Sequence, residues 1–217
     1  MRKTKPNQSA KALATRIRQH LGKMPFALQQ VQFNLLDSHD ASRLHNNPAI
    51  SWEATKVAIT ILFTLPGTPS IYYGDEAGMV GWTDPDNRRS YPWGKQDWEL
   101  IEFHKDMIRI HKKYECFRSG SYKSIASGSH WICYGRFNKK LQAVILINNR
   151  RETLTVDLPI WQIGILENAC LKRVIQTTQS TYNVGEVMER AEDGILHVTV
   201  GPQTASVYIA AKNVEEN

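Results

Sequence analysis

The sequence has few cysteines, and they are placed unfavourably for a metal site. Its 217 residues contain three, Cys116, Cys133 and Cys170, which are widely spaced and form no CxxC pair. Zinc sites built from cysteine need closely spaced ligands, and disulfide frameworks need a denser, even-numbered set. We therefore expect no metal site and no cofactor, and the unpaired thiols favour a reducing, cytoplasmic location.

The sequence also lacks a hydrophobic run long enough to cross a membrane. The longest apolar stretch, residues 57–65, is much shorter than the ~18 residues that a membrane-spanning helix needs. The N-terminal residues are polar and do not resemble the apolar segment of a signal peptide. We expect no membrane partner.

Negative charge is in deficit, which gives the chain a formal net charge of +6. An excess of positive charge indicates nucleic-acid binding when it gathers on one face or accompanies a recognition motif. Here the basic residues are scattered, and the densest run is MRKTK at residues 1–5. The charge therefore favours an ordinary solvated surface, and we expect no nucleic-acid partner.

The first half of the chain alternates helical and strand-like patterns. Ser9 and Ser51 are typical N-cap residues that precede apolar residues at helical spacing, and apolar residues at the same spacing predict a further helix from Asp97. Short apolar runs at residues 32–36 and 70–73 predict two strands. The segment of roughly thirty residues that joins them suits a right-handed βαβ crossover, which makes the strands parallel. Two parallel strands cannot bury both faces alone, so this half predicts part of a larger barrel or sheet.

The second half has the pattern of antiparallel strands, and the boundary is expected near residues 116–119. Leu154, Val156 and Leu158 alternate with polar residues, as in strands with one buried face. Turn-forming NKK and NNRR separate the first three runs. Strands are predicted in the runs ICYGRF, LQAVILIN, TLTVDL, ILHVTV and ASVYIA.

Charged and aromatic side chains follow both predicted strands of the first half. In parallel barrels, functional residues gather at these carboxyl ends. Carboxylates and histidine can hydrogen-bond sugar hydroxyls, and aromatic rings can stack on the apolar faces of sugars. The combination suits a neutral polyhydroxylated ligand. The residues are Asp37, His39, Asp40 and Arg43 after the first strand, Asp75 and Glu76 after the second, and Asp84, Asp86, Arg88, Arg89, Trp82, Tyr91 and Trp93 in the following loop.

Two interpretations of these charges stay open from the residues alone. Asp75 and Glu76 could act as a glycosidase pair, but adjacent side chains usually point in different directions, so a structural pair is the alternative. For His39 and Asp40, the alternative to a functional site is a surface turn.

Three motifs in this region resemble a known family. They are FNLLDSHDASR at residues 33–43, LPGTPSIYYGDEAGM at residues 65–79 and WTDPDNRRSYPW at residues 82–93. In this order they resemble the fourth conserved region, the eighth-strand segment and the Asp-Pro-x-x-Arg loop of the alpha-amylase superfamily, glycoside hydrolase family 13. The amino-acid sequences of these motifs are most similar to those of its neopullulanase, cyclomaltodextrinase and maltogenic amylase branch.

The resemblance implies a fold of class α/β plus all-β. Residues 1–116 would form the C-terminal part of a catalytic (β/α)8 TIM barrel, with strands 7 and 8 and their flanking helices. Residues 117–217 would form a C-terminal antiparallel β-sandwich domain.

The resemblance also implies individual roles. Asp40 matches the family's third active-site carboxylate, which stabilises the distorted, oxocarbenium-like sugar, and His39 matches the histidine that bonds the same sugar. Asp84 and Arg88 match residues that contact the neighbouring sugar on the non-reducing side. Arg43 ends an Ala-Ser-Arg sequence where Thr-x-Arg is more usual, and we expect it to bind substrate. The family does not use the positions of Asp75 and Glu76 as nucleophile and acid.

The family's nucleophile motif, Gly-Phe-Arg-x-Asp, and its acid/base glutamate have no match in this sequence. Retaining hydrolysis needs two carboxylates ~5–5.5 Å apart. We therefore expect part of a retaining α-glucan hydrolase that binds α-glucan or maltooligosaccharide but is inactive alone. Its partner would be the missing N-terminal barrel portion, or a second copy through self-association. The alternative is a non-catalytic α-glucan-binding or interaction protein.

Overall fold

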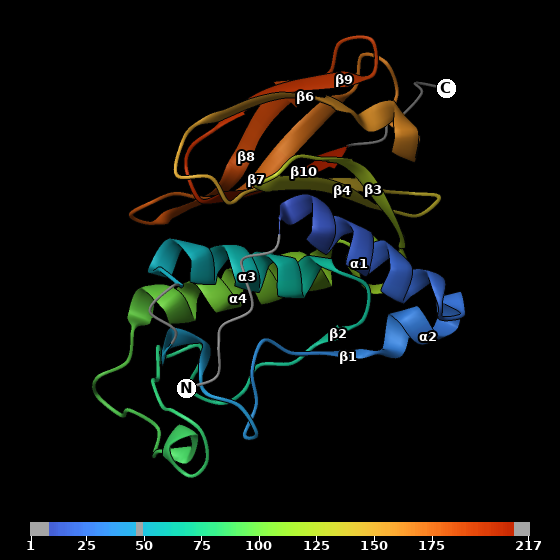
Figure 1. Cartoon of the computed structure of the whole chain (residues 1–217). Helices are drawn as coiled ribbons and strands as arrows, with labels where there is room; N and C mark the ends of the chain where they lie inside the picture. The colour runs from blue at the N-terminus through green and yellow to red at the C-terminus, as the bar shows by residue number, and fades with distance from the viewer. Residues whose placement is uncertain (1–8, 47–49, 211–217) are drawn as a thin grey trace.

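The computed structural model describes residues 9–46 and 50–210 (Figure 1). Helices cover one face of a large antiparallel sheet, and a small second sheet covers the other face. The helices are α1 (Ala10–Gly22), α2 (Phe26–Val31), α3 (Trp52–Thr64), α4 (Trp98–Lys113) and α5 (Cys116–Ser119), with 3-10 turns η1 (Leu44–Asn46), η2 (Asp86–Arg88) and η3 (Ile160–Ile163).

The three helices predicted to begin at Ser9, Ser51 and Asp97 are confirmed. The side chains of Ser9, Ser51 and Asp97 each accept a hydrogen bond from the backbone N–H three residues later, at 3.2, 3.2 and 2.9 Å. These bonds satisfy amide groups that have no partner inside the helix. Helix α2, which follows Pro25, was not predicted from the sequence. The fixed φ of Pro25, −52°, suits the start of this helix.

The two predicted strands of the first half are parallel, as expected, but very short. β1 (Phe33–Asn34) pairs with β2 (Thr68–Pro69) in the register Phe33 to Thr68. The prediction of a strand at residues 70–73 was wrong, because pairing with β1 ends after Ser70 N donates to Asn34 O at 2.8 Å. The chain then turns, and Asp75 N donates to Tyr72 O at 3.1 Å.

The apolar run that begins at Phe33 is largely exposed in the structure. Phe33 is 68% exposed, and Leu35 and Leu36 are also exposed. Within residues 9–46 and 50–210, β1 pairs with β2 alone. The apolar pattern is therefore that of a strand in a larger sheet, while its outer face is open in this chain.

The β-rich half contains a six-stranded sheet in the order β3-β4-β5-β10-β7-β8 and a two-stranded sheet of β6 and β9. All five strands predicted in this half are confirmed. Three were missed: β3 and β8 carry too few apolar residues for a clear pattern, and β7 lies in the segment with the weakest signal. The strands are β3 (Ser121–Ser127), β4 (Trp131–Phe137), β5 (Gln142–Asn148), β6 (Leu154–Pro159), β7 (Cys170–Thr177), β8 (Tyr182–Arg190), β9 (Ile195–Val200) and β10 (Thr204–Ala210).

Alternate residues of the central strand β5 serve two separate cores. Ile145 and Ile147 face the helices, where they join Phe103 and Met107 of α4. Val144 and Leu146 face the small sheet, together with side chains of β6 and β9. In Figure 1 the helices lie below the large sheet and β6 and β9 lie above it. The period of two along the strand therefore builds both layers of packing.

Arg136 of β4 joins the helices to the sheet from a fully buried position. Its guanidinium donates to Thr64 O at 2.7 Å, Phe117 O at 3.1 Å and Gly120 O at 3.0 Å. Nearby, the hydroxyls of Tyr134 and Thr64 are hydrogen-bonded at 2.6 Å. These bonds satisfy carbonyls at the ends of α3 and α5, where a positive charge is favourable. Burial lowers the pKa of Arg136 to about 10.

Candidate active-site loops

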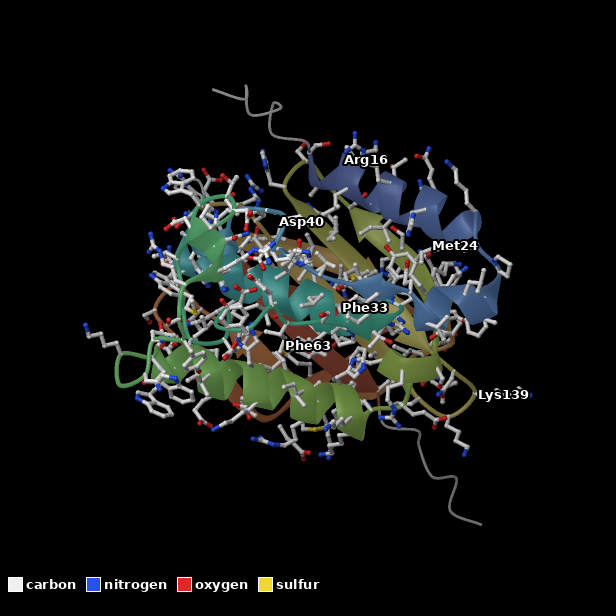
Figure 2. All side chains as sticks on the ribbon, turned by 90° about the horizontal axis from the view of Figure 1, so that it is seen from below. Arg16, Met24, Phe33, Asp40, Phe63 and Lys139 are labelled. Atoms are coloured by element: carbon white, nitrogen blue, oxygen red, sulfur yellow. The ribbon has the colours of Figure 1, made fainter. Side chains whose placement is uncertain are left out.

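His39 and Asp40 lie on an exposed turn directly after β1. The turn is held locally by Asp40 N, which donates to Ser38 Oγ at 3.2 Å, and by Ala41 N, which donates to Ser38 O at 3.1 Å. The side chains are 56% and 80% exposed, and His39 Nε2 lies 3.3 Å from Asp40 Oδ1. Seen from below, Asp40 and Phe33 lie on the side of the molecule away from the large sheet (Figure 2). Both groups can reach a ligand at this surface.

Asp84 and Arg88 lie on the loop between β2 and α4. They form an ion pair between Arg88 Nε and Asp84 Oδ1, and both side chains are about half exposed. Next to them, Asp86 accepts bonds from Trp82 N at 2.6 Å and Arg89 Nε at 2.8 Å, and these two bonds lower the pKa of Asp86. The loop is therefore ordered by its own charges and leaves Asp84 and Arg88 accessible.

Aromatic rings stand at the surface of the same loop. Tyr91 and Trp93 have ring centroids 4.5 Å apart, and Trp93 is 79% exposed. Trp82 is also exposed. Exposed rings beside carboxylates and an arginine keep the combination that suits a sugar ligand.

Arg43 differs from the expectation that it contacts substrate. Its side chain is fully buried, its Nη1 donates to Asp75 Oδ1 at 2.8 Å, and its Nε donates to Asn87 O at 3.0 Å. The guanidinium also lies over the rings of Tyr72 and Tyr73, at 4.2 and 4.9 Å from their centroids. A ligand at the surface cannot touch this group, because protein atoms surround it.

Asp37 and Asp75 form a buried carboxyl pair beside Arg43. Asp37 Oδ2 accepts a bond from Leu44 N at 2.6 Å. Burial, together with a hydrogen bond to Asp37 and the charge of Asp37, raises the pKa of Asp75 to about 9, against the opposing effect of Arg43. With a pKa raised to about 9, the carboxyl group of Asp75 is protonated near pH 7.

Asp75 and Glu76 do not converge on a common point. Asp75 points to Arg43, whereas Glu76 Oε2 accepts a bond from Gly74 N at 2.8 Å. Both carboxylates are bound within the protein, Asp75 by a distant side chain and Glu76 by a nearby backbone N–H. Their arrangement agrees with the structural interpretation of this adjacent pair.

Asn87 is a residue of this region that sequence reasoning missed. It is fully buried, and its Nδ2 donates to His39 O and Ala41 O, both at 2.7 Å. It therefore joins the turn that carries His39 and Asp40 to the loop that carries Asp84 and Arg88. The sequence signal that could have indicated Asn87 is its position within WTDPDNRRSYPW, between the candidate residues Asp86 and Arg88.

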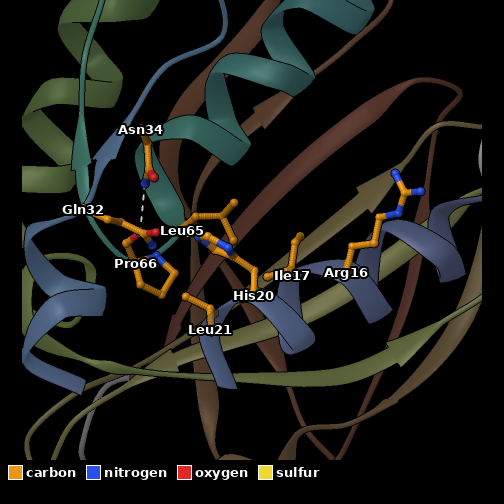
Figure 3. A pocket seen from close by; sticks show the side chains of 8 residues that line it. All are labelled: Arg16, Ile17, His20, Leu21, Gln32, Asn34, Leu65 and Pro66. Atoms are coloured by element: carbon orange, nitrogen blue, oxygen red, sulfur yellow. Dashed lines mark hydrogen bonds between the residues drawn. The ribbon is translucent and has the colours of Figure 1, made fainter. Parts of the chain in front are cut away.

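A cavity of about 240 Å³ lies between α1 and the start of β1 (Figure 3). Gln32 and Asn34 each donate to Pro66 O at 2.8 Å, and His20 Nε2 lies 3.0 Å from Gln32 Oε1. The cavity sits at the amino end of the parallel pair, whereas His39 and Asp40 follow its carboxyl end. Its lining residues are Arg16, Ile17, His20, Leu21, Gln32, Asn34, Leu65 and Pro66.

Metal and membrane features are absent from the described part of the chain. Among residues 9–46 and 50–210, no three or more histidine, cysteine, aspartate or glutamate side chains gather as metal ligands. No helix in those same ranges has the length and apolar character needed to span a membrane.

Comparison with known proteins identifies the family. The sequence pattern described as "Alpha amylase, catalytic domain" matches residues 2–147. The chain therefore belongs to the alpha-amylase family of glycoside hydrolases, and the resemblance stated from its three motifs is confirmed.

Particular relatives agree with the neopullulanase and cyclomaltodextrinase branch. The chain is 33% identical over 173 residues to a cyclomaltodextrinase of Geobacillus thermopakistaniensis, a match that covers 75% of this chain and 29% of that protein. It is 34% identical over 144 residues to neopullulanase 2 of Thermoactinomyces vulgaris, covering 64% of this chain and 25% of the relative. The chain therefore spans less than a third of the length of these relatives.

Solved structures show the same likeness over nearly the whole chain. The Nostoc punctiforme debranching enzyme superposes with a TM-score of 0.78 at 26% identity, over 94% of this chain and 39% of that protein. An Anoxybacillus alpha-amylase gives the same TM-score and identity, over 94% of this chain and 43% of the other.

Proposed function

We propose that this chain is part of an α-glucan hydrolase and supplies residues that hold and distort the sugar at the cleaved bond. The observation that carries the proposal is the joining of two exposed polar loops, His39–Asp40 and Asp84–Arg88, after a pair of parallel strands. The names of the relatives, cyclomaltodextrinase and neopullulanase, support an α-glucan as the substrate class.

Each proposed contact has a chemical reason. Asp40 places a carboxylate where positive charge develops on the sugar ring, and preorganised charge of this kind lowers the barrier of the reaction. His39 hydrogen-bonds the same sugar. Asp84 accepts hydrogen bonds from hydroxyls of the next sugar, and Arg88 donates hydrogen bonds to them. Arg43 does not contact the ligand in this proposal. Its buried guanidinium lies beneath the loops and stabilises their positions.

The architecture that we propose for the complete enzyme is a (β/α)8 barrel. In it, β1 and β2 are strands 7 and 8, residues 1–116 are the C-terminal part of the barrel, and residues 117–217 are a β-sandwich domain. The parallel pairing of β1 and β2 across α3 supports this assignment. A barrel closes only with its full set of strands, so the other six come from outside these residues.

Exposed apolar side chains mark where the remaining barrel would pack. Phe26, Leu28 and Val31 of α2 and Phe33 of β1 are all more than half exposed. Together with the open edge of β1, they form a surface suited to a further strand and its neighbours. We propose the N-terminal barrel portion as the partner of this surface. When that portion is absent, a second copy of the chain takes its place through self-association.

The nucleophile and the acid/base residue would come from the same missing portion. Asp40 alone fills neither role, because retaining hydrolysis needs two carboxylates on opposite sides of the bond. The chain alone is therefore inactive in this proposal. A cytoplasmic location fits its cysteines, since Cys116, Cys133 and Cys170 are all unpaired.

A chimera tests the proposal. The N-terminal portion of the Geobacillus thermopakistaniensis cyclomaltodextrinase is fused ahead of this chain, and release of reducing sugar from cyclodextrin, pullulan and starch is measured. We expect activity from the chimera and none from the 217 residues alone. Asp40→Asn should reduce the chimera's activity by about a hundredfold or more, as removal of preorganised transition-state charge does. Asp157→Asn, an exposed carboxylate of β6, is the matched control and should be neutral.

Two outcomes would contradict the proposal in different ways. Hydrolysis by the pure 217-residue chain that is lost in Asp40→Asn would refute the claim that it is inactive alone. A folded chimera that binds maltooligosaccharide without cleaving any glucan would instead support a non-catalytic α-glucan-binding protein.

A further inference from the structure

We propose that Asn87 is a positioning residue that fixes the His39–Asp40 turn against the loop of Asp84 and Arg88. The consequence for ligand binding rests on the proposed function, whereas the positioning itself rests on contacts within the chain. Asn87 sets the spacing between the groups assigned to one sugar and the groups assigned to the next.

The side-chain amide of Asn87 is committed to the turn. Nδ2 donates to His39 O and Ala41 O at 2.7 Å each, and Ser38 O lies further away at 3.4 Å. The amide has two hydrogens, and the two short bonds use both. The two bonded carbonyls lie one residue before and one residue after Asp40. The amide therefore holds the backbone on both sides of that carboxylate.

The orientation of the amide follows from its surroundings. All three neighbours are backbone carbonyl oxygens, which accept hydrogen bonds and never donate them. The nitrogen of Asn87 must face them, because the reversed amide would place oxygen against oxygen. Only a side chain with two donors at this length can satisfy both sides of the turn.

The backbone of Asn87 is held from the opposite side. Its carbonyl accepts from Arg43 Nε at 3.0 Å and from Tyr72 Oη at 3.4 Å. Gly81 approaches so closely that a Cβ there would lie 2.7 Å from the Cα of Asn87. Arg43 N in turn donates to Gly81 O at 2.9 Å. Asn87 is thus a buried residue that contacts the His39–Asp40 turn, Arg43 and Gly81.

The position of Asn87 in the chain links it to the proposed ligand contacts. Asn87 belongs to η2, the short helix that also contains Arg88, and Asp84 lies three residues earlier. A movement of Asn87 would therefore move both members of the Asp84–Arg88 pair relative to Asp40. Reacting groups that are displaced by about 1 Å from their productive positions lose much of their effect. A residue that fixes these positions therefore matters for function.

The chain offers a matched control for this role. Asn148 of β5 is also fully buried, and its Nδ2 donates to Glu152 O at 3.0 Å and Gly201 O at 2.7 Å. It joins two loops of the β-rich half, in a different part of the fold. Asn148→Asp and Asn87→Asp therefore make the same chemical change at two buried amides that each donate to two carbonyls; Asn148 Oδ1 also accepts from Arg150 N at 2.9 Å.

Amide hydrogen exchange on the folded chain tests the positioning. In Asn87→Asp, we expect the amides of Ala41 and Arg43 to exchange roughly tenfold faster, as loss of buried hydrogen bonds worth about 1.4 kcal/mol would give. Amides of β5 and β10 should keep the wild-type rates. In Asn148→Asp the pattern should be reversed. Unchanged exchange at Ala41 and Arg43 in Asn87→Asp would overturn the proposal.

Titration with maltoheptaose, followed by the NMR signals of His39 and Asp40, tests the consequence. We expect Asn87→Asp to weaken binding about tenfold and Asn148→Asp to leave it unchanged, because 1.4 kcal/mol corresponds to that factor. Absence of binding by the wild-type chain would contradict the proposed function, while the exchange result would still decide the role of Asn87. Equal weakening in both variants would overturn a local positioning role.

Asn87→Ala keeps the test decisive if Asn87→Asp does not fold. Alanine removes the donors without bringing a negative charge against three carbonyls. The same faster exchange at Ala41 and Arg43 is expected in a folded Asn87→Ala chain. Failure of both variants to fold would assign Asn87 to global stability and overturn the proposal.

Discussion

The guanidinium of Arg43 and the carboxyl group of Asp75 lie 2.8 Å apart beneath the exposed loops, with the arginine side chain fully buried. Arg43 follows β1 in the sequence and Asp75 follows β2, so the contact joins the segments at the carboxyl ends of both parallel strands. Through Asn87 O, the same arginine also reaches the loop of Asp84 and Arg88. One buried cation therefore organises the base of the candidate site.

Removal of this cation should strongly destabilise the chain. In Arg43→Met the carboxyl pair of Asp37 and Asp75 loses its compensating charge, and we expect a loss of about 3 kcal/mol, the usual cost of breaking a buried pair. Arg89→Met is the control, because its pair with Asp86 is solvent-exposed and should contribute less than about 1 kcal/mol. Urea unfolding of both variants measures the difference. Equal, small losses would show that Arg43 is not structural.

The stability of the fold should fall as the pH rises from 7 to 9. The pKa of Asp75 is raised by burial from 3.8 to about 9 in the folded state, so between these values the folded chain binds a proton that the unfolded chain does not. Stability from this group is therefore fully present at low pH and is lost as pH rises toward 9. One proton contributes a slope of at most about 1.4 kcal/mol per pH unit.

Asp75→Asn isolates this effect. The amide cannot ionise, so the slope between pH 7 and 9 should flatten, whereas Asp157→Asn on the exposed face of β6 should keep it. The histidines His45, His104 and His111 do not interfere, because burial lowers the pKa of each below 6.5. Urea unfolding at pH 7, 8 and 9 gives the slopes. A wild-type chain whose stability is constant over this range would contradict the prediction.

Structural features set by residues close in sequence were predictable, whereas features set by distant residues were not. Ser9 and Ser51 were correctly predicted as helix caps, because a cap is decided by residues within one turn. The alternation of Leu154 and Leu158 was equally readable, since both are buried between the small sheet and the large sheet. The exposure of Phe33 could not be predicted, because an apolar run has the same sequence pattern whether or not another element covers it.

In the candidate site, too, some features were predictable from the sequence and others were not. The motifs indicated which loops carry chemistry, and the structure places His39, Asp40, Asp84 and Arg88 on exposed segments joined by Asn87. The burial of Arg43 was not readable, because its partners lie 32 and 44 residues further along the chain. Side-chain type indicated a ligand contact, and only the packing assigned the arginine to the protein interior.

Arg136 should be as important for the fold as Arg43 is for the loops. Arg136→Met leaves the carbonyls of Thr64, Phe117 and Gly120 without their donor inside the protein, and each unsatisfied buried group costs about 1–3 kcal/mol. We expect a total loss of about 3 kcal/mol or more, measured by urea unfolding. Arg150→Met removes only an exposed pair with Glu152 and should change stability by less than about 1 kcal/mol. If Arg136→Met matched this control, the buried arginine would not join helices and sheet.

The open surface of α2 and β1 should make the isolated chain self-associate. Val31 and Phe33 are each 68% exposed, and β1 offers an unpaired edge beside them. Apolar side chains next to a free strand edge favour association with another copy. The double variant Val31→Lys, Phe33→Lys should shift the chain toward monomer in light scattering at equal concentration. Val184→Lys, Val187→Lys is the matched control, since these exposed valines lie on β8 at the other end of the fold. A wild-type chain that is monomeric would refute self-association, and a shift produced only by the β8 variant would place the contact on the large sheet instead.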